Sequence, residues 1–485
     1  MLKGSLFVVL ILCSLTLSIH AEDDFDEFSD EYFIDEPVFG GKSRIIETGR
    51  DNKELIVLVH GLGDRAADTW NNVIPQLSDR YHVLTFDLPG FGQSSKSNQL
   101  YSPDNYVAFI HYVVRQTGHE SFYLMGHSMG GNIALRYTTT YPHKVKRLML
   151  IDTAGILHRI TYANSLTQLG TKFLPKIDPD QNEGIRGIAG AILGELARRN
   201  SLFESGEQIV LNTPALRQNI LGGNPSTIAA YAMSMTDFSS SLHSIKTPTL
   251  IVWGELDNVT PLRTARVLAT NLRNSGLVII GNAGHVPMDD KPLEFNWWLN
   301  KFVTGTESDF NAVLRQQQYK IDTQKPITSK RVASCKNNSQ TLFRGDYQEI
   351  IIENCRDVEI DTARMQSLSI RDSQVTMNNC YIKSSGKAML AINSNIQMNG
   401  CTIVGQPAIE FKKTSMDIAG SWLRSNSAAL MNTDEPPTEK RRRQGPIPGF
   451  ETNDTTLMFS VSHINSKYFD KTLHGPVNFM PDQAW

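Results

Sequence analysis

The chain has 485 residues, of which 40% are hydrophobic and 20% charged, with a formal net charge of −3 at pH 7. It is too long for one ordinary hydrophobic core, so we expect two domains with additional tails. The chain has no excess of basic residues, so its charge gives no reason to expect nucleic acid or an anionic membrane surface as a partner.

The N-terminus has the pattern of a secretory signal peptide. Lys3 precedes an apolar run of 14 residues at 6–19, and Ala21 stands just before an acidic segment. The run is shorter than the ~20 residues of a membrane-spanning helix. We therefore predict a signal peptide at 1–21, a secreted, periplasmic or extracellular protein, and no membrane span after cleavage. An uncleaved anchor is the alternative.

Residues 22–37 are mostly acidic, and we expect 22–43 to be a solvated leader. From 44 to 304, short apolar runs of strand length alternate with longer stretches of helical periodicity. This alternation predicts a mostly parallel sheet covered by helices on both faces. The expected strands are 55–59, 83–86, 122–125, 148–151, 250–253 and 277–280.

Residues 154–244 interrupt the alternation because they carry no strong strand signal. Apolar residues at helical spacing occur at 188–199. We interpret 154–244 as a helical insertion between two strands of the sheet.

A short repeat appears in the C-terminal half. The stretches 375–382, 396–403 and 416–423 align at intervals of 21 and then 20 residues. Their alternation and their Asn and Gly turns predict stacked coils of a β-solenoid over 345–430, which resembles a right-handed parallel β-helix. We expect 305–344 to be a linker and 431–485 to be a tail.

Four of the five cysteines lie in this half: Cys335, Cys355, Cys380 and Cys401. Export permits disulfides, and four cysteines allow three pairings among which the sequence does not decide. Three of them occupy equivalent places in the repeat, so we expect Cys355, Cys380 and Cys401 to lie in one row.

The segment "GHSMG" at 126–130 places Ser128 between an apolar run and a helical stretch. Glycines on either side permit a sharp strand-to-helix turn that projects a serine hydroxyl from the sheet edge. The amides and dipole at the N-terminus of the next helix favour an oxyanion nearby. We therefore predict that Ser128 is a nucleophile.

A serine nucleophile needs a base, and the base needs an orienting acid. Asp257 follows the strand at 250–253, and His285 follows the strand at 277–280. Both stand after strands, where ligand sites gather in open α/β sheets. We predict Asp257 as the acid and His285 as the base, with Asp152 as a rival acid after the preceding strand.

The segment "HGLG" at 60–63 follows the strand at 55–59. A loop there can direct a backbone N–H toward the reacting carbonyl oxygen, so we predict the amides of Leu62 and Met129 as the oxyanion donors. We expect His60 to support this loop by hydrogen bonding, and His127 to pack beside the serine.

These motifs together, with "FDLPGFGQS" at 86–94 and "GHVP" at 284–287, make residues 44–304 similar to α/β-hydrolases of the lipase and esterase type. The resemblance implies a central sheet, a helical cap at 154–244 and hydrolysis of carboxylic esters through an acyl-enzyme. It implies neither a metal nor an organic cofactor. Asp87, within the second motif, is expected to be structural.

The resemblance implies an ester of a small molecule or a lipid as the substrate. Two alternatives remain at this point. One is a polysaccharide deacylase in which the solenoid holds the polymer. The other is a non-catalytic surface-binding protein that uses the hydrolase domain as a scaffold.

Overall fold

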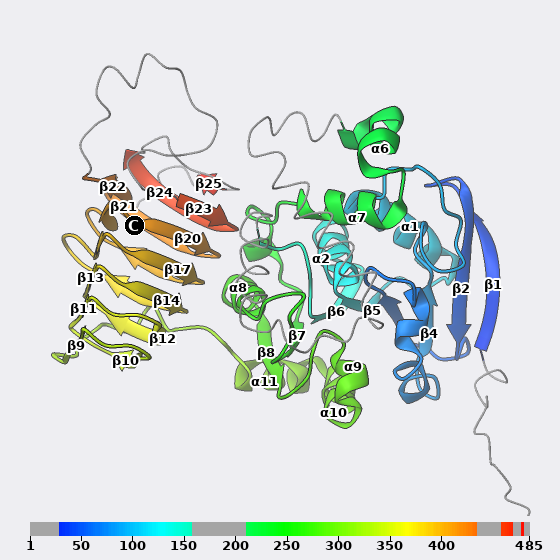
Figure 1. Ribbon diagram of the computed structural model, residues 1–485. Coiled ribbons are helices and arrows are strands. Elements are labelled where there is room, and N and C mark those ends of the chain that lie inside the picture. The colour runs from blue at the N-terminus through cyan, green and yellow to red at the C-terminus, as the bar shows by residue number, and fades with distance from the viewer. Residues whose placement is uncertain (1–28, 158–209, 434–456, 469–476, 480–485) are drawn as a thin grey trace, which may run out of the picture.

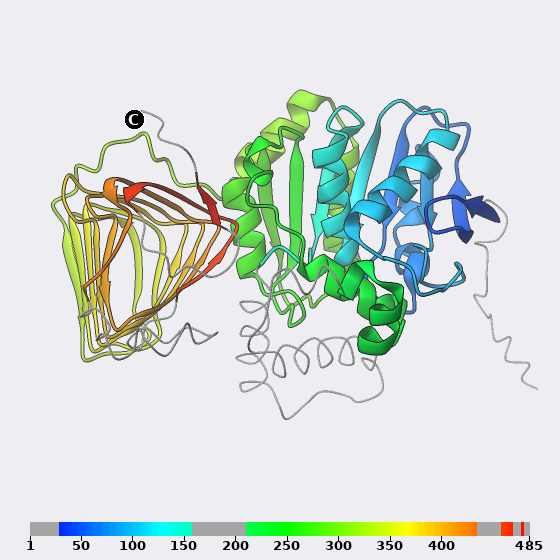
Figure 2. The ribbon, with the colours of Figure 1, turned by 90° about the horizontal axis from the view of Figure 1, so that it is seen from above.

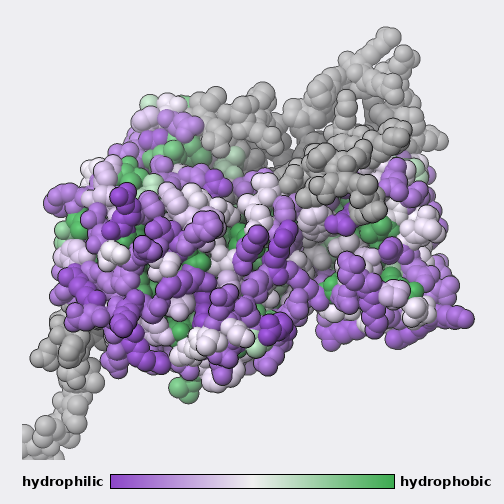
Figure 3. Space-filling view, turned by 180° about the vertical axis from the view of Figure 1, so that it is seen from behind, coloured by the Kyte–Doolittle hydropathy of each residue, from purple (hydrophilic) through white to green (hydrophobic). Residues whose placement is uncertain are grey.

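The computed structural model describes residues 29–157, 210–433, 457–468 and 477–479, and shows an α/β layered body beside a β-solenoid (Figure 1). The predicted signal peptide and the helical pattern at 188–199 lie outside these residues. No described helix has the length and apolar character needed to cross a bilayer. Seen from behind, both bodies are mainly hydrophilic, with hydrophobic residues scattered among the polar ones (Figure 3).

An eight-stranded sheet forms the centre of the α/β body, in the order β1-β2-β4-β3-β5-β6-β7-β8. β2 runs antiparallel to both of its neighbours, and all other neighbouring strands are parallel. The strands are β1 (Ser29–Glu36), β2 (Gly41–Thr48), β3 (Leu55–Val59), β4 (His82–Phe86), β5 (Phe122–His127), β6 (Val145–Ile151), β7 (Thr249–Gly254) and β8 (Ser275–Ile280).

Helices cover both faces of this sheet (Figure 2). Successive strand residues point to opposite faces, so Val57 belongs to one hydrophobic core and Leu58 to the other. One face carries α1 (Pro103–Gln116), α2 (Met129–Thr140) and α8 (Arg263–Asn271); the other carries α10 (Pro292–Val303) and α11 (Glu307–Gln316), with the short α9 (Pro287–Asp290) before α10. The predicted parallel sheet with helices on both faces is confirmed.

The insertion between β6 and β7 is helical where the structure describes it. It contains α6 (Pro214–Leu221), α7 (Pro225–Ser234) and the 3-10 turn η3 (Leu242–Ser244). Two further 3-10 turns, η1 (Ala66–Trp70) and η2 (Ile74–Gln76), lie between β3 and β4.

The second body is a solenoid of parallel strands around one hydrophobic core. Gln374 pairs with Asn395, and Asn395 pairs with Ser415, so each sequence repeat is one coil. Figure 2 looks along the stack of coils. The strands are β9 (Val332–Lys336), β10 (Leu342–Asp346), β11 (Glu349–Glu353), β12 (Val358–Met365), β13 (Ser367–Arg371), β14 (Gln374–Asn378), β15 (Tyr381–Lys383), β16 (Met389–Ile392), β17 (Asn395–Asn399), β18 (Thr402–Val404), β19 (Ile409–Lys412), β20 (Ser415–Ala419), β21 (Trp422–Ala428), β22 (Leu430–Asn432), β23 (Leu457–Ser460), β24 (Ser462–Tyr468) and β25 (Val477–Phe479).

The stretch expected as a linker, 305–344, contains regular elements. Its first part forms α11, because Thr306 and Asp309 make a reciprocal capping box and Phe310 and Leu314 are buried against the sheet. Its last part forms β9 and β10, which begin the solenoid before the expected boundary at 345.

The two segments expected to lie outside the domains also contain strands. In the acidic leader, Ser29–Glu36 pairs with β2 as an edge strand, because Tyr32 and Ile34 alternate inward onto the core. In the tail, β23 and β24 extend the solenoid by pairing with β20 and β21.

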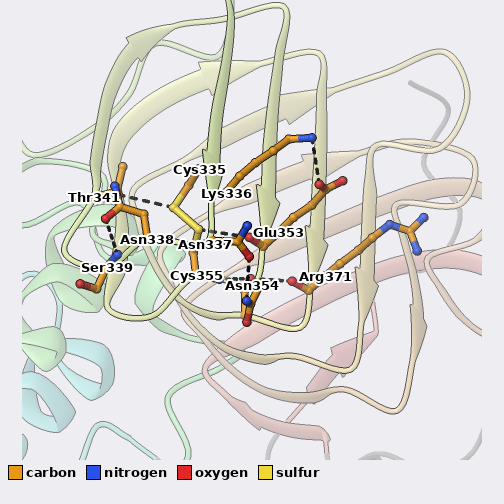
Figure 4. The surroundings of a disulfide bond; sticks show 11 residues. Cys335, Lys336, Asn337, Asn338, Ser339, Thr341, Glu353, Asn354, Cys355 and Arg371 are labelled. Atoms are coloured by element: carbon orange, nitrogen blue, oxygen red, sulfur yellow. Dashed lines mark hydrogen bonds and ion pairs between the residues drawn. A yellow bond between two sulfur atoms is a disulfide. The ribbon is translucent and has the colours of Figure 1, made fainter.

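A disulfide joins Cys335 on β9 to Cys355 after β11, near the first coil (Figure 4). Beside it, Lys336 and Glu353 form an ion pair of 3.0 Å. Cys380 and Cys401 are buried free thiols. The N–H of Cys380 donates to Sγ of Cys401 at 3.4 Å, so these two cysteines stack along one row as expected. Cys355 does not share that row: its N–H donates to Ser373 Oγ, so it heads a different row of the solenoid, and the prediction was wrong for this residue.

The solenoid packs directly on α8. The Arg263 guanidinium makes an ion pair of 2.6 Å with Asp417, and its Nε donates to Asn399 Oδ1 at 2.9 Å. Gly400 has a φ of +63°, and a Cβ there would lie 2.3 Å from the Thr270 hydroxyl oxygen. A glycine at this coil corner therefore lets the solenoid backbone approach the helix closely.

Candidate active site

Ser128 lies at the turn between β5 and α2 with φ 54° and ψ −118°, a conformation that few residues other than glycine adopt. Its N–H donates to the carbonyl of Ile151 at 2.9 Å, which ties the turn to β6. A Cβ at Gly126 would lie 2.2 Å from the Gly130 carbonyl oxygen, and one at Gly130 would lie 2.1 Å from that of Val59. The glycines of the motif are therefore required by backbone packing.

Ser128, His285 and Asp257 form a continuous hydrogen-bonded relay. His285 Nε2 lies 3.0 Å from Ser128 Oγ, and His285 Nδ1 lies 2.9 Å from Asp257 Oδ2. With its proton on Nδ1, the imidazole donates to the carboxylate and accepts from the hydroxyl. The three side chains come from the ends of β5, β7 and β8, and the structure brings together the three residues that the sequence singled out.

The Asp257 carboxylate is nearly enclosed but well supplied with donors. Oδ1 accepts the N–H groups of Val259 at 2.8 Å and Thr260 at 2.9 Å. Oδ2 accepts the Thr260 hydroxyl as well as His285. Burial alone would raise the pKa of Asp257, but the charge of His285 and the hydrogen bonds outweigh it and lower the pKa. Asp257 is therefore held as an anion.

The loop 60–63 lies beside the serine, since a Cβ at Gly61 would approach the Ser128 Cβ to 2.8 Å. In the part of the chain that the structure describes, the N–H groups of Leu62 and Met129 donate to no other group. His60 fixes the loop: its Nδ1 donates to the Gly61 carbonyl at 2.7 Å. Burial lowers the pKa of His60 to about 4, so this ring is neutral at neutral pH.

The other polar side chains around the relay make contacts of a structural kind. His127 Nε2 donates to the His285 carbonyl at 2.7 Å, and burial lowers the pKa of His127 to about 3. Asp87 accepts the N–H groups of Ala67 and Gln93. Asp152 lies against the relay, but its carboxyl is not bonded to His285.

Sequence reasoning did not identify Thr260, whose hydroxyl donates to Asp257. The only signal was its place three residues after the acid, where a hydroxyl can bond back to a carboxylate. Among the described residues, Asp152, Asp257 and His285 offer atoms close enough together for a cation. His285 Nδ1 already donates to Asp257, so we assign the atoms of these two residues to the relay rather than to a cation.

Comparison with known proteins agrees with this architecture. Residues 54–292 match the family described as the alpha/beta hydrolase fold. The monoacylglycerol lipase abhd6-B of Xenopus laevis is 27% identical over 267 residues, which span 54% of this chain and 78% of that protein. A 2-hydroxy-6-oxononadienedioate/2-hydroxy-6-oxononatrienedioate hydrolase of Klebsiella pneumoniae is 28% identical over 270 residues, 52% of this chain and 88% of that one.

Among solved structures, an esterase from Exiguobacterium antarcticum is 22% identical with a TM-score of 0.43, over 57% of this chain and 100% of that chain. From the family match and the strand order, the N-terminal part of this chain has the α/β-hydrolase fold, which confirms the resemblance seen in the sequence. The C-terminal part is a β-solenoid of parallel strands. The relatives named above include a lipase and another hydrolase.

Proposed function

We propose that the protein is a secreted serine hydrolase that cleaves carboxylic esters through an acyl-enzyme. The relay from Ser128 through His285 to Asp257 carries the proposal. A serine Oγ, a base nitrogen within 3.0 Å and an orienting carboxylate within 2.9 Å are the groups that acyl transfer to serine requires.

In the proposed reaction, Ser128 Oγ attacks the ester carbonyl while its proton moves to His285 Nε2. The amides of Leu62 and Met129 stabilise the resulting oxyanion. His285 then gives the proton to the leaving alcohol, which leaves an acyl-enzyme on Ser128. A water molecule attacks the acyl carbonyl while His285 takes its proton. His285 returns the proton to Ser128 Oγ as the carboxylic acid is released. Asp257 holds the imidazole in its tautomer and stabilises the imidazolium.

The substrate we propose is an ester of a small molecule or a lipid. Similarity to a monoacylglycerol lipase supports an acylglycerol. Two features support export of the protein. One is the signal-like N-terminus, and the other is the Cys335–Cys355 disulfide, because such bonds persist in oxidising compartments.

An acylated polysaccharide is a second candidate. A groove of about 640 Å³ lies between the outer side of β15, β18 and β21 and the segment around Lys320. Its lining includes Lys383, Arg424 and Asn426, which could hydrogen-bond a hydroxyl-rich polymer. The comparisons lend this candidate no support, and it ranks second.

The test is hydrolysis of p-nitrophenyl esters from acetyl to palmitoyl by the purified mature protein, by Ser128→Ala and by Ser97→Ala. Ser97 is an exposed serine outside the relay and serves as the matched control. We expect the wild type and Ser97→Ala to be active, and Ser128→Ala to lose activity by about 10⁶-fold, the usual cost of removing such a nucleophile.

The chain-length profile separates the substrates. A preference for long chains supports a lipase, whereas activity on acetyl esters together with acetate release from an acetylated polysaccharide supports the second candidate. Equal inactivity of folded wild type and Ser128→Ala would overturn ester hydrolysis and favour the non-catalytic alternative.

A further inference from the structure

Asp152 is a fully buried carboxyl group that the proposed reaction does not use. It follows β6 directly and has a φ of 41°, so its position is fixed by a backbone conformation that Asp and Asn tolerate better than most residues. It occupies the rival acid position that the sequence indicated, one strand away from Asp257.

The contacts of Asp152 are unequal at its two carboxyl oxygens. Oδ1 accepts the N–H of Gly254 at 2.9 Å. Oδ2 is buried and faces no hydrogen-bond donor among the described residues. A carboxyl oxygen of Asp152, one of Asp257 and a ring nitrogen of His285 all lie within 4.8 Å of one another. The carboxyl group of Asp152 thus lies in the immediate surroundings of the relay.

Two ionised carboxylates are not stable side by side in a buried site, so one of them holds a proton. Asp257 receives four donors, from Val259 N, Thr260 N, the Thr260 hydroxyl and His285 Nδ1. Asp152 receives one. The proton therefore belongs on Asp152. On Oδ2 it converts the buried oxygen that lacks a hydrogen-bond partner into a hydrogen-bond donor.

We propose that Asp152 is a positioning residue: a neutral carboxylic acid whose Oδ2–H donates a hydrogen bond to the Asp257 carboxylate. The inference rests on the proposed function, because it assigns Asp257 as the acid of the relay. Burial raises the pKa of Asp152 well above its usual range, with the charge of Asp257 next and that of Asp290 adding to it.

The bond has two consequences for the relay. It fixes the rotamer of Asp257, so that Oδ2 stays directed at His285. It also leaves one negative charge in the pair, which the imidazolium formed during the reaction neutralises. Among the described residues, Asp257, His285 and Asp290 are the titratable groups that face Asp152, from the loops after β7 and β8 and from α9.

The test compares Asp152→Asn with Asp152→Gly. Asparagine keeps the shape, the acceptor for Gly254, the tolerance of positive φ and a donor toward Asp257. Glycine keeps only the backbone conformation. We expect kcat/KM of Asp152→Asn to stay within about threefold of the wild type, and Asp152→Gly to lose about 10²-fold, as a misplaced relay does.

The pH profile of kcat/KM shows whether Asp152 is neutral or ionised, because the two states shift its acid limb in opposite directions. Loss of a neutral donor makes the Asp257 carboxylate more basic, and a more basic carboxylate favours the protonated form of the relay. The acid limb of Asp152→Gly therefore moves to higher pH, while that of Asp152→Asn stays in place. If Asp152 were ionised, removing its charge would move the acid limb to lower pH in both variants. That result, or wild-type behaviour of Asp152→Gly, overturns the proposal.

An infrared measurement works even if no ester is hydrolysed. We expect the wild type at neutral pH to show the C=O stretching band of a buried protonated carboxylic acid, and Asp152→Asn to lack it. Absence of the band in the wild type refutes the neutral acid. Presence of the band in an inactive protein would instead refute only the proposed function.

Discussion

Two residues at neighbouring strand ends, Ser128 and Asp152, hold positive φ values without being glycine. Such conformations cost of order 1–3 kcal/mol each and persist where the surrounding structure enforces them. Here the Ser128 N–H on the Ile151 carbonyl joins the two turns. The strain is thus shared between the proposed nucleophile and the carboxyl that supports the relay.

The sequence predicted the relay residues because each stands directly after a strand in a recognisable motif. It did not predict that Asp152 and Asp257 would lie together, since the packing of two adjacent strand ends decides this. The role of Thr260 was equally hidden, because it depends on the rotamer of a hydroxyl inside the β7–α8 loop.

Glu47, on β2, is a single buried carboxyl group through which the stability of the fold is expected to depend on pH. It is buried, lies 2.6 Å from His82 Nε2 and accepts the Tyr32 hydroxyl at 2.7 Å. Burial opposes its ionisation, but the hydrogen bonds from His82 and Tyr32 and the charges of His82 and Arg50 lower the pKa of Glu47 from 4.5 to about 2. Its ionised form therefore stabilises the fold above pH 4.5, and that stability is lost as the pH falls through about 2.

We expect Glu47→Gln to lower the free energy of unfolding by about 1.5–3 kcal/mol at neutral pH, the range for a hydrogen bond to a charged group. The difference from the wild type should shrink between pH 4.5 and 2. Urea unfolding at a series of pH values measures it, with Glu294→Gln on the first turn of α10 as control. A difference that is constant with pH would contradict this account.

At the level of elements, regular coils were predictable and irregular ones were not. The coils with β14, β17 and β20 each repeat a pair of buried apolar residues two positions apart (Val375 and Met377, Ile396 and Met398, Met416 and Ile418), so their period is visible. The earlier strands β9 and β10 lack this repetition, and for this reason the sequence predicts a linker where they lie. In α11 the capping pattern is present in the sequence at Thr306 and Asp309. The helix has two buried residues, Phe310 and Leu314, and two apolar positions are too few to show a helical periodicity.

The capping box of α11 can be tested by Thr306→Ala. The Thr306 hydroxyl accepts the N–H of Asp309 at 3.2 Å. Because the N-cap satisfies a helix-end donor, we expect a loss of about 1 kcal/mol in the free energy of unfolding. Thr306→Ser keeps the hydroxyl and should lose less than half as much. Equal losses in the two variants would show that the methyl group, not the cap, matters.

For the whole molecule, the contact between α8 and the solenoid joins the two bodies through polar as well as apolar groups. Ala419 and Val461 of the solenoid share a hydrophobic core with α8. The Asn271 side chain donates to the Gly420 carbonyl at 2.9 Å. The sequence predicted two domains, but it could not predict this contact, because its partners are far apart in the chain.

Substitutions of the Arg263–Asp417 pair test how much this contact contributes to the free energy of unfolding. Arg263→Met leaves a carboxylate in a mostly buried place, so we expect a loss of about 3–5 kcal/mol in the free energy of unfolding. Arg263→Met with Asp417→Leu removes both charges and should recover part of that loss. Denaturant unfolding measures both variants, and a double variant less stable than the single one would contradict the reasoning.

The position of α8 also matters for the order in which the protein is made. Domains fold as they leave the ribosome, beginning with the N-terminal one. The face of α8 that carries Arg263, Val267 and Asn271 is finished long before Asn399, Asp417 and Gly420 are synthesised. A nascent chain therefore displays this face uncovered until the solenoid is synthesised and packs against it.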